Sequence, residues 1–126
     1  MEMIENPDNA RAVLQVIINA PKPLLFHCAV GKDRTGIYAN MILEAAGVDI
    51  NDRQAHYLES YSHLRLYALA NWDFVKTLPS CLFTPNLSYL EDFNKMFYAR
   101  YKDLDAYLRF VGLSEDEITK FKNLLL

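Results

Sequence analysis

Residues 26–36 form the stretch FHCAVGKDRTG, in which a histidine, a cysteine, a glycine, two cations and an acid lie between two apolar segments. The preceding run LLFHC (24–28) has the length and apolar character of a buried parallel strand. The following segment TGIYANMILEAAG (35–47) has helical spacing, with Gly47 as a left-handed stop. We therefore expect a tight loop that joins a strand to a helix beginning near Arg34.

Such a loop is suited to bind an anion. Its successive backbone N–H groups point inward, and the N-terminus of the following helix adds positive potential. Gly31 permits the chain reversal because it tolerates a positive φ, and Arg34 can bind two oxygens of one phosphate. Cys28 lies at the mouth of this potential, which should lower the pKa of its thiol and favour the nucleophilic thiolate. Thr35 can hydrogen-bond the sulfur, and His27 is expected to orient the loop.

Composition predicts a single domain over residues 1–126. The chain is 52% hydrophobic, with a formal charge of −3 and a pI near 5.5, which argues against a general nucleic-acid or anionic-membrane binder. No apolar run approaches the roughly 20 residues of a membrane span. We expect a cytoplasmic protein, with secretion of a longer parent protein as the alternative. The two cysteines and three histidines follow no disulfide or metal-ligand pattern, so no metal or cofactor is expected.

Helical periodicity predicts further helices at 7–20, 53–69, 87–101, 103–112 and 115–126. Asp8 or Asn9 is the expected cap of the first, Asn51 or Asp52 that of the second, and Ser114 with Glu117 forms a capping box. The expected buried positions of the first two helices are Ala12, Val13, Val16 and Ile17, then Leu58, Tyr61, Leu64 and Leu69.

The single confident strand has no visible partner. A weaker strand is predicted at 81–84, but a lone strand leaves its backbone donors and acceptors unpaired. We therefore expect the C-terminal, mostly helical part of an α/β fold with a central parallel sheet, from which the N-terminal strands are missing. Alternatively, a homodimer completes the sheet.

Cys28, five residues and Arg34, preceded by His27, resemble the loop of the cysteine-dependent protein tyrosine phosphatases. The longer string HCAVGKDRTG resembles the bacterial and fungal tyrosine phosphatase branch, whose loop is typically HCxAGKDRTG. A weaker similarity runs through HYLESY (56–61) to YLRFVGLSEDEI (107–118). The resemblance thus covers the chain from about Lys22 onward.

The resemblance implies that Cys28 is the nucleophile, Arg34 the phosphate clamp and Asp33 the general acid. Lys32 resembles the loop lysine associated with activity on phosphoinositides as well as phosphotyrosine. The residues implied to bind phosphate are Ala29, Val30, Gly31, Lys32, Asp33, Arg34 and Thr35.

Three features depart from that branch. Val30 replaces an alanine, which should be tolerable because its backbone N–H faces the phosphate. His56 stands where an aspartate is usual, so the contacts of that region are expected to differ. The N-terminal half of the family, with its NFRDLGG-type opening and several strands, is missing.

The leading hypothesis is a phosphomonoester hydrolase that forms a phosphocysteine intermediate without a metal, acting on a phosphorylated protein or a phosphoinositide. One alternative is a truncated or degenerate phosphatase that binds phosphate or a phosphoprotein. A weaker one is a structural fragment that pairs with its own copy. A Walker-type loop is disfavoured, because Asp33 occupies its Ser/Thr position and the upstream glycine is absent.

Overall fold

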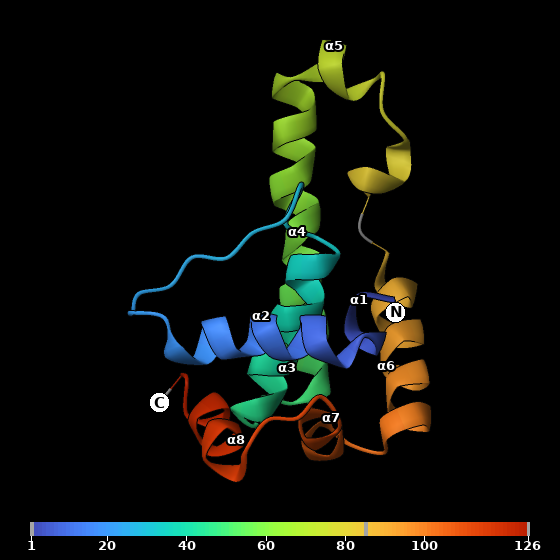
Figure 1. Cartoon of the computed structure of the whole chain (residues 1–126). Coiled ribbons are helices and arrows are strands. Elements are labelled where there is room, and N and C mark those ends of the chain that lie inside the picture. Colours follow the sequence, from blue (N-terminus) through green and yellow to red (C-terminus); the bar gives the residue numbers. More distant parts are fainter. Residues whose placement is uncertain (1, 85, 126) are drawn as a thin grey trace.

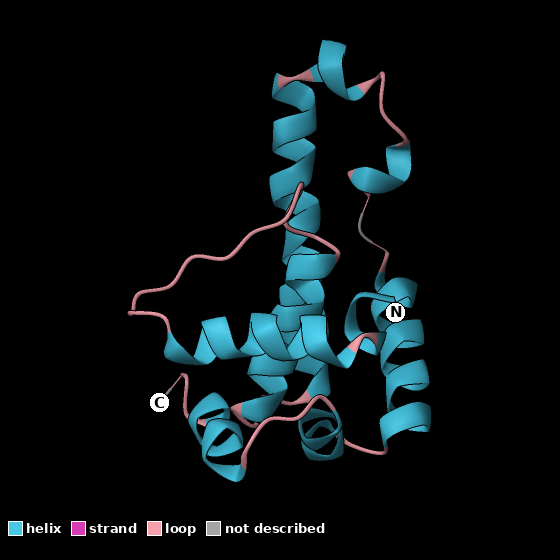
Figure 2. Ribbon diagram, viewed as in Figure 1, coloured by secondary structure: helices cyan, strands magenta, loops and turns pink. Residues whose placement is uncertain are grey.

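The computed structural model describes residues 2–84 and 86–125, and this part of the chain consists of helices and loops without a strand (Figures 1 and 2). In chain order the elements are α1 (Glu2–Glu5), α2 (Pro7–Asn19), α3 (Arg34–Ala45), α4 (Ile50–Ala70), α5 (Trp72–Val75), the 3₁₀ helix η1 (Ser80–Leu82), α6 (Leu87–Tyr101), α7 (Leu104–Phe110) and α8 (Glu115–Lys122). Within the described ranges, no helix combines the length and apolar character that a bilayer crossing requires.

The core lies where α2, α3, α6, α7 and α8 meet. Helices α2, α3 and α7 all pack on α8, and α7 also packs on α3 and α6. Aromatic rings of Phe97, Tyr101 and Tyr107 form its centre, with ring centroids 4.9, 5.0 and 5.3 Å apart. The buried Tyr107 hydroxyl donates to the carbonyl oxygen of Ile4 at 3.0 Å, so the aromatic core also holds α1 in place.

A buried polar network joins α3, α4 and α6. The guanidinium of Arg53 donates to Asn40 Oδ1 at 3.2 Å and to Glu44 Oε2 at 2.9 Å. The Tyr98 hydroxyl donates to the same Glu44 oxygen at 2.7 Å. Because the guanidinium is buried, the carboxylate compensates much of its desolvation. The network holds the middle and last turns of α3 against α4 and α6.

The helix ends depend on local capping. The capping box of Ser114 and Glu117 is confirmed, and α6 has the predicted bounds. The predicted caps of α2 and α4 are wrong, because Asn6 and Asp49 take those positions and accept hydrogen bonds from the N–H groups two and three residues later.

Helix α2 buries a different face from the one expected. Its buried residues are Ala10, Leu14, Ile17 and Ile18, whereas Val13 and Val16 are 40% and 63% exposed. Helix α2 is apolar on two sides, and the helical core covers only one of them. The predicted face is therefore wrong apart from Ile17, and an apolar face is left open.

Helix α4 buries only a few of its side chains, namely Arg53, Tyr57 and Leu64. Leu64 is buried as predicted, but Leu58, Tyr61 and Leu69 are exposed. Figure 1 accounts for the exposure of Leu69: the second half of α4 projects beyond the other long helices and carries α5 at its end. The projecting half therefore has few partners against which to bury side chains.

The predicted strands do not form within the described residues. Residues 24–28 run as a loop from α2 towards α3 (Figure 2), because a strand needs a neighbour that satisfies its ladder groups. The weaker strand predicted at 81–84 is also wrong, since residues Ser80–Leu82 form η1. The mostly helical character is confirmed, and the central sheet stays a prediction.

Candidate active site

The loop before α3 forms the expected chain reversal. Gly31 has φ +72°, and a Cβ built there would have no atom within 4 Å. Its backbone conformation, rather than a close contact, therefore favours glycine. Helix α3 begins at Arg34 as predicted, and the Asp33 side chain makes no capping bond. The loop thus presents backbone N–H groups beside a helix N-terminus.

The thiol of Cys28 is activated by this loop. Partial burial raises its pKa, but hydrogen bonds from the Thr35 hydroxyl and backbone N–H outweigh that effect. The backbones of Gly31 and Val30 contribute further bonds, and the resulting pKa is about 7, below the ordinary 9.0. The Thr35 hydroxyl is buried with no geometric hydrogen-bond partner among the described residues, so donating to the sulfur would cost it no other bond. A large fraction of Cys28 is therefore thiolate at neutral pH.

Cys28 borders two cavities. The first, of about 500 Å³, lies between Cys28, Arg34, Phe26 and the open apolar face of α2. The second, of about 570 Å³, lies between residues 27–31 and the projecting half of α4. Its far wall is apolar and consists of Leu64, Tyr67, Phe74, Leu78, Leu82 and Phe83. A phosphorylated group at Cys28 would thus have space on both sides.

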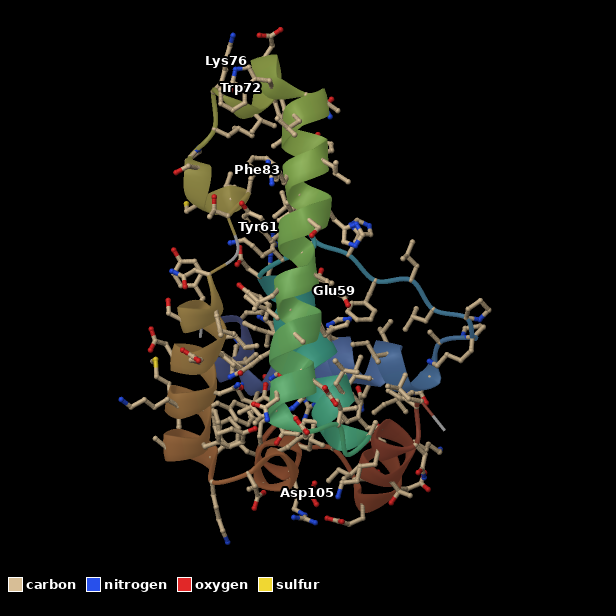
Figure 3. The ribbon with its side chains drawn as sticks, turned by 180° about the vertical axis from the view of Figure 1, so that it is seen from behind. Glu59, Tyr61, Trp72, Lys76, Phe83 and Asp105 are labelled. Carbon is tan, nitrogen blue, oxygen red and sulfur yellow. The ribbon has the colours of Figure 1, made fainter. Side chains whose placement is uncertain are left out.

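Aromatic stacking closes the far side of the second cavity. Phe83 extends from the end of η1 towards α4 (Figure 3), where its ring stacks on Tyr67 at a centroid distance of 6.1 Å. His63 lines the same cavity one helical turn before Tyr67. No role was predicted for His63 or Tyr67 from the sequence. Their spacing of four residues places both on one face of a helix, and this was the signal that could have linked them to one site.

Arg34 lies beside Cys28, and its role as a phosphate clamp stays a prediction. Its side chain is exposed and lines the first cavity together with Cys28 and Thr35. Among residues 2–84 and 86–125 it forms no ion pair. Its guanidinium is therefore available to an anion.

The side chains of Asp33 and Lys32 line neither of the two cavities beside Cys28. Their side chains pair with each other, with Lys32 Nζ 3.1 Å from an Asp33 carboxylate oxygen. Asp33 lines a small pocket with Tyr57 and Tyr89 and neither of the cavities that Cys28 borders. Lys32 is 2% exposed and donates to the Cys81 carbonyl oxygen at 2.9 Å. The acid role of Asp33 and the phosphate contact of Lys32 remain predictions.

His27 and His56 lie in different surroundings near the loop. His27 Nδ1 lies 3.1 Å from the carbonyl oxygen of Cys28 and donates to it in the tautomer with a proton on Nδ1. This contact supports the expected orienting role. His56 lines a small pocket behind the loop with Thr35, Gly36 and Arg53. Within the described ranges, no group of three or more His, Cys, Asp or Glu side chains is arranged to hold a metal ion.

Comparison with known proteins points to one family. The chain is 36% identical over 94 residues to a "Putative tyrosine-protein phosphatase" of Cupriavidus necator, an alignment that covers 70% of this chain and 34% of that protein. It is 28% identical over 135 positions to the "Triple specificity protein phosphatase PtpB" of Mycobacterium tuberculosis, covering 92% of this chain and 49% of that protein. A "Tyrosine-protein phosphatase" of Nostoc commune is 50% identical over 42 residues, covering 29% of this chain and 14% of that protein.

The chain thus spans about half or less of the length of these relatives. No solved structure matches it significantly. The family model described as "Tyrosine phosphatase family" matches residues 1–126, the whole chain. The protein therefore belongs to the tyrosine phosphatase family.

Proposed function

We propose that this chain carries the reaction centre of a phosphomonoester hydrolase that works through a phosphocysteine intermediate. The observation that carries the proposal is the Cys28 thiol, with a pKa of about 7, bordering the same cavity as the Arg34 guanidinium, which forms no ion pair with the described residues. A nucleophile and an oxyanion clamp are the two groups that phosphoryl transfer requires of a protein. The names of the relatives give no support to the binding-module alternative.

The proposed reaction has two steps. The Cys28 thiolate attacks phosphorus and the phosphorus–oxygen bond of the ester breaks, while Asp33 protonates the leaving oxygen. Water then attacks the phosphocysteine and gives a proton to the Asp33 carboxylate, while the phosphorus–sulfur bond breaks, which releases inorganic phosphate and returns the sulfur as a thiolate. Arg34 and the loop N–H groups, from Ala29 to Thr35, hold the phosphoryl oxygens in both steps. The Thr35 hydroxyl stabilises the departing thiolate.

Asp33 is suited to the acid role by its exposure and by its place in the loop. Its side chain is 56% exposed and paired with Lys32, so reaching a leaving oxygen requires only a change of its own rotamer and the loss of that pair. Because Lys32 is only 2% exposed, the loss of this pair carries a cost. The buried ammonium would keep the Cys81 carbonyl oxygen and the Tyr89 ring as partners.

The proposed substrates are phosphotyrosine and, as further candidates, phosphoserine, phosphothreonine or phosphoinositides. The apolar wall of the second cavity supports an ester with an aromatic or apolar organic part, since such a group would bury its surface against Leu82 and Phe83. The printed name of the M. tuberculosis relative describes three specificities of that protein. For this chain, the substrate range stays part of the proposal.

We also propose that residues 1–126 are part of a larger α/β domain. The open face of α2, with Val13 and Val16, and the loop 24–26 together line the first cavity, which is where a neighbouring strand would pack. Alternatively, where the chain stands alone, a second copy of it is the proposed occupant of this face. Light scattering should then give twice the monomer mass of 14.6 kDa, and Val16→Lys should return the monomer without unfolding it, because Val16 is 63% exposed. A wild-type monomer with full activity would contradict this proposal.

The cysteine mechanism has a direct test. Cys28→Ser should abolish release of phosphate from p-nitrophenyl phosphate but leave inorganic phosphate affinity nearly unchanged, because the hydroxyl is a far poorer nucleophile in the same loop. Cys81→Ser is the matched control and should retain turnover. Acid quenching of the wild type should trap a protein heavier by one phosphoryl group. Turnover that survives in Cys28→Ser, or that disappears with a chelator, would refute the mechanism.

A further inference from the structure

We propose that Lys32 is a positioning residue, whose buried ammonium holds the segment around η1 against the cysteine loop and does not bind substrate. The inference deepens the proposed function and rests on it for the reaction that is measured. It assigns to the loop lysine a task different from the one implied by resemblance, in which its charge meets highly phosphorylated substrates.

The ammonium joins three separate parts of the chain. Lys32 Nζ donates to the carbonyl oxygen of Cys81 in η1 at 2.9 Å and lies 3.1 Å from the Asp33 carboxylate in the loop. The ring of Tyr89, in the first turn of α6, lies with its centroid 5.4 Å from the same nitrogen. An ammonium has three donors and no acceptor. The partners of this one come from the loop, from η1 and from α6.

The burial of the Lys32 ammonium makes a contact between it and a substrate phosphate costly. Lys32 is 2% exposed and lines neither of the cavities that Cys28 borders. A buried ammonium is tolerated only where partners compensate its lost hydration, and here a carboxylate, a carbonyl and a ring do so. Drawing it out to a phosphate would break all three contacts and leave the Cys81 carbonyl without its donor.

The same contacts hold one wall of the site in place. Cys81 immediately precedes Leu82 and Phe83, which line the second cavity opposite Cys28. Lys32 immediately follows Gly31, whose backbone N–H is one of the groups that serve the thiol. The bond from Lys32 to Cys81 therefore couples the geometry of the thiol donors to the position of the apolar wall.

The test compares Lys32→Met with Lys95→Met, a control on the exposed side of α6. Both variants are made on a Cys81→Ser background, which keeps the Cys81 backbone carbonyl and leaves Cys28 as the only thiol. We expect Lys32→Met to speed amide hydrogen exchange at residues 80–84 by at least about tenfold, since one charge-assisted hydrogen bond is lost. Its Cys28 alkylation profile should move to higher pH, and Lys95→Met should change neither.

Two substrates separate positioning from recognition. Lys32→Met should lower kcat/KM for p-nitrophenyl phosphate and for an inositol polyphosphate by the same factor, because a displaced loop weakens the reaction with any ester. A loss confined to the polyphosphate, with exchange at 80–84 unchanged, would overturn the inference. If the wild type turns over neither substrate, the proposed function fails, while the exchange and alkylation results still decide the role of Lys32.

A milder variant covers the case in which Lys32→Met does not fold. Tyr89→Leu removes only the ring contact, and Tyr89 is 48% exposed, so folding should survive. We expect the same direction of change in exchange and alkylation at a smaller magnitude. If Tyr89→Leu leaves both measurements at their wild-type values, the inference is wrong.

Discussion

Replacing Thr35 with alanine should raise the pKa of the Cys28 thiol. The Thr35 hydroxyl is the one side-chain donor among the groups that lower this pKa to about 7. It is buried with no geometric hydrogen-bond partner among the described residues, so a donation to the sulfur would cost it no other bond. The variant removes this donor and leaves the backbone N–H groups of the loop in place.

The expected size of the change follows from the strength of one hydrogen bond to a charged group. Such bonds contribute about 1.5–3 kcal/mol when fully buried, and we take about 1 kcal/mol for the partly exposed thiolate. This moves the pKa from about 7 to roughly 7.7, because about 1.4 kcal/mol corresponds to one pKa unit. The thiolate fraction at pH 7 then falls from about one half to about one sixth, and the alkylation rate falls about threefold.

The assay is the pH dependence of iodoacetamide alkylation in a Cys81→Ser background, so that only Cys28 reacts. Because the folded pKa rises, the reactive form is lost between about pH 7 and 8 and recovered at higher pH. Thr35→Ser keeps the hydroxyl and should retain the wild-type profile. Equal profiles for Thr35→Ala and wild type would mean that the backbone donors alone activate the thiol.

Two further predictions concern the loop and the network behind it. Gly31→Ala forces a side chain into φ +72° and should cost about 1–2 kcal/mol of unfolding free energy in urea and weaken phosphate binding by calorimetry. The control Gly47→Ala, at φ +84° in equally open space, should cost similar stability and leave phosphate affinity unchanged. Arg53→Met leaves Glu44 without its cation and should cost about 3 kcal/mol in the same urea assay; a loss below about 1 kcal/mol would show that solvent reaches the carboxylate.

Local features of the fold were predictable from sequence, and long-range ones were not. The start of α3, the bounds of α6 and the capping box of α8 depend on residues within one turn of each other. The buried face of α2 depends on which of its two apolar sides the core covers, and that choice is made by α8, about one hundred residues later in the chain. The strand at 24–28 failed for a related reason, since a strand exists only where another chain segment satisfies its backbone.

The candidate site also has features that the sequence predicts and features that it does not, as Arg34 and Lys32 show. Cys28, Gly31 and Arg34 lie within seven residues, so their spacing alone predicts an activated thiol beside an anion clamp. Arg34 is exposed and borders the Cys28 cavity, whereas Lys32, two residues earlier, is buried against Cys81 and Tyr89, 49 and 57 residues away. Proximity in sequence therefore does not give two cations the same ligand. In a tight loop, successive side chains reach different surroundings, and a cation contributes to substrate binding only where its charge faces the cavity.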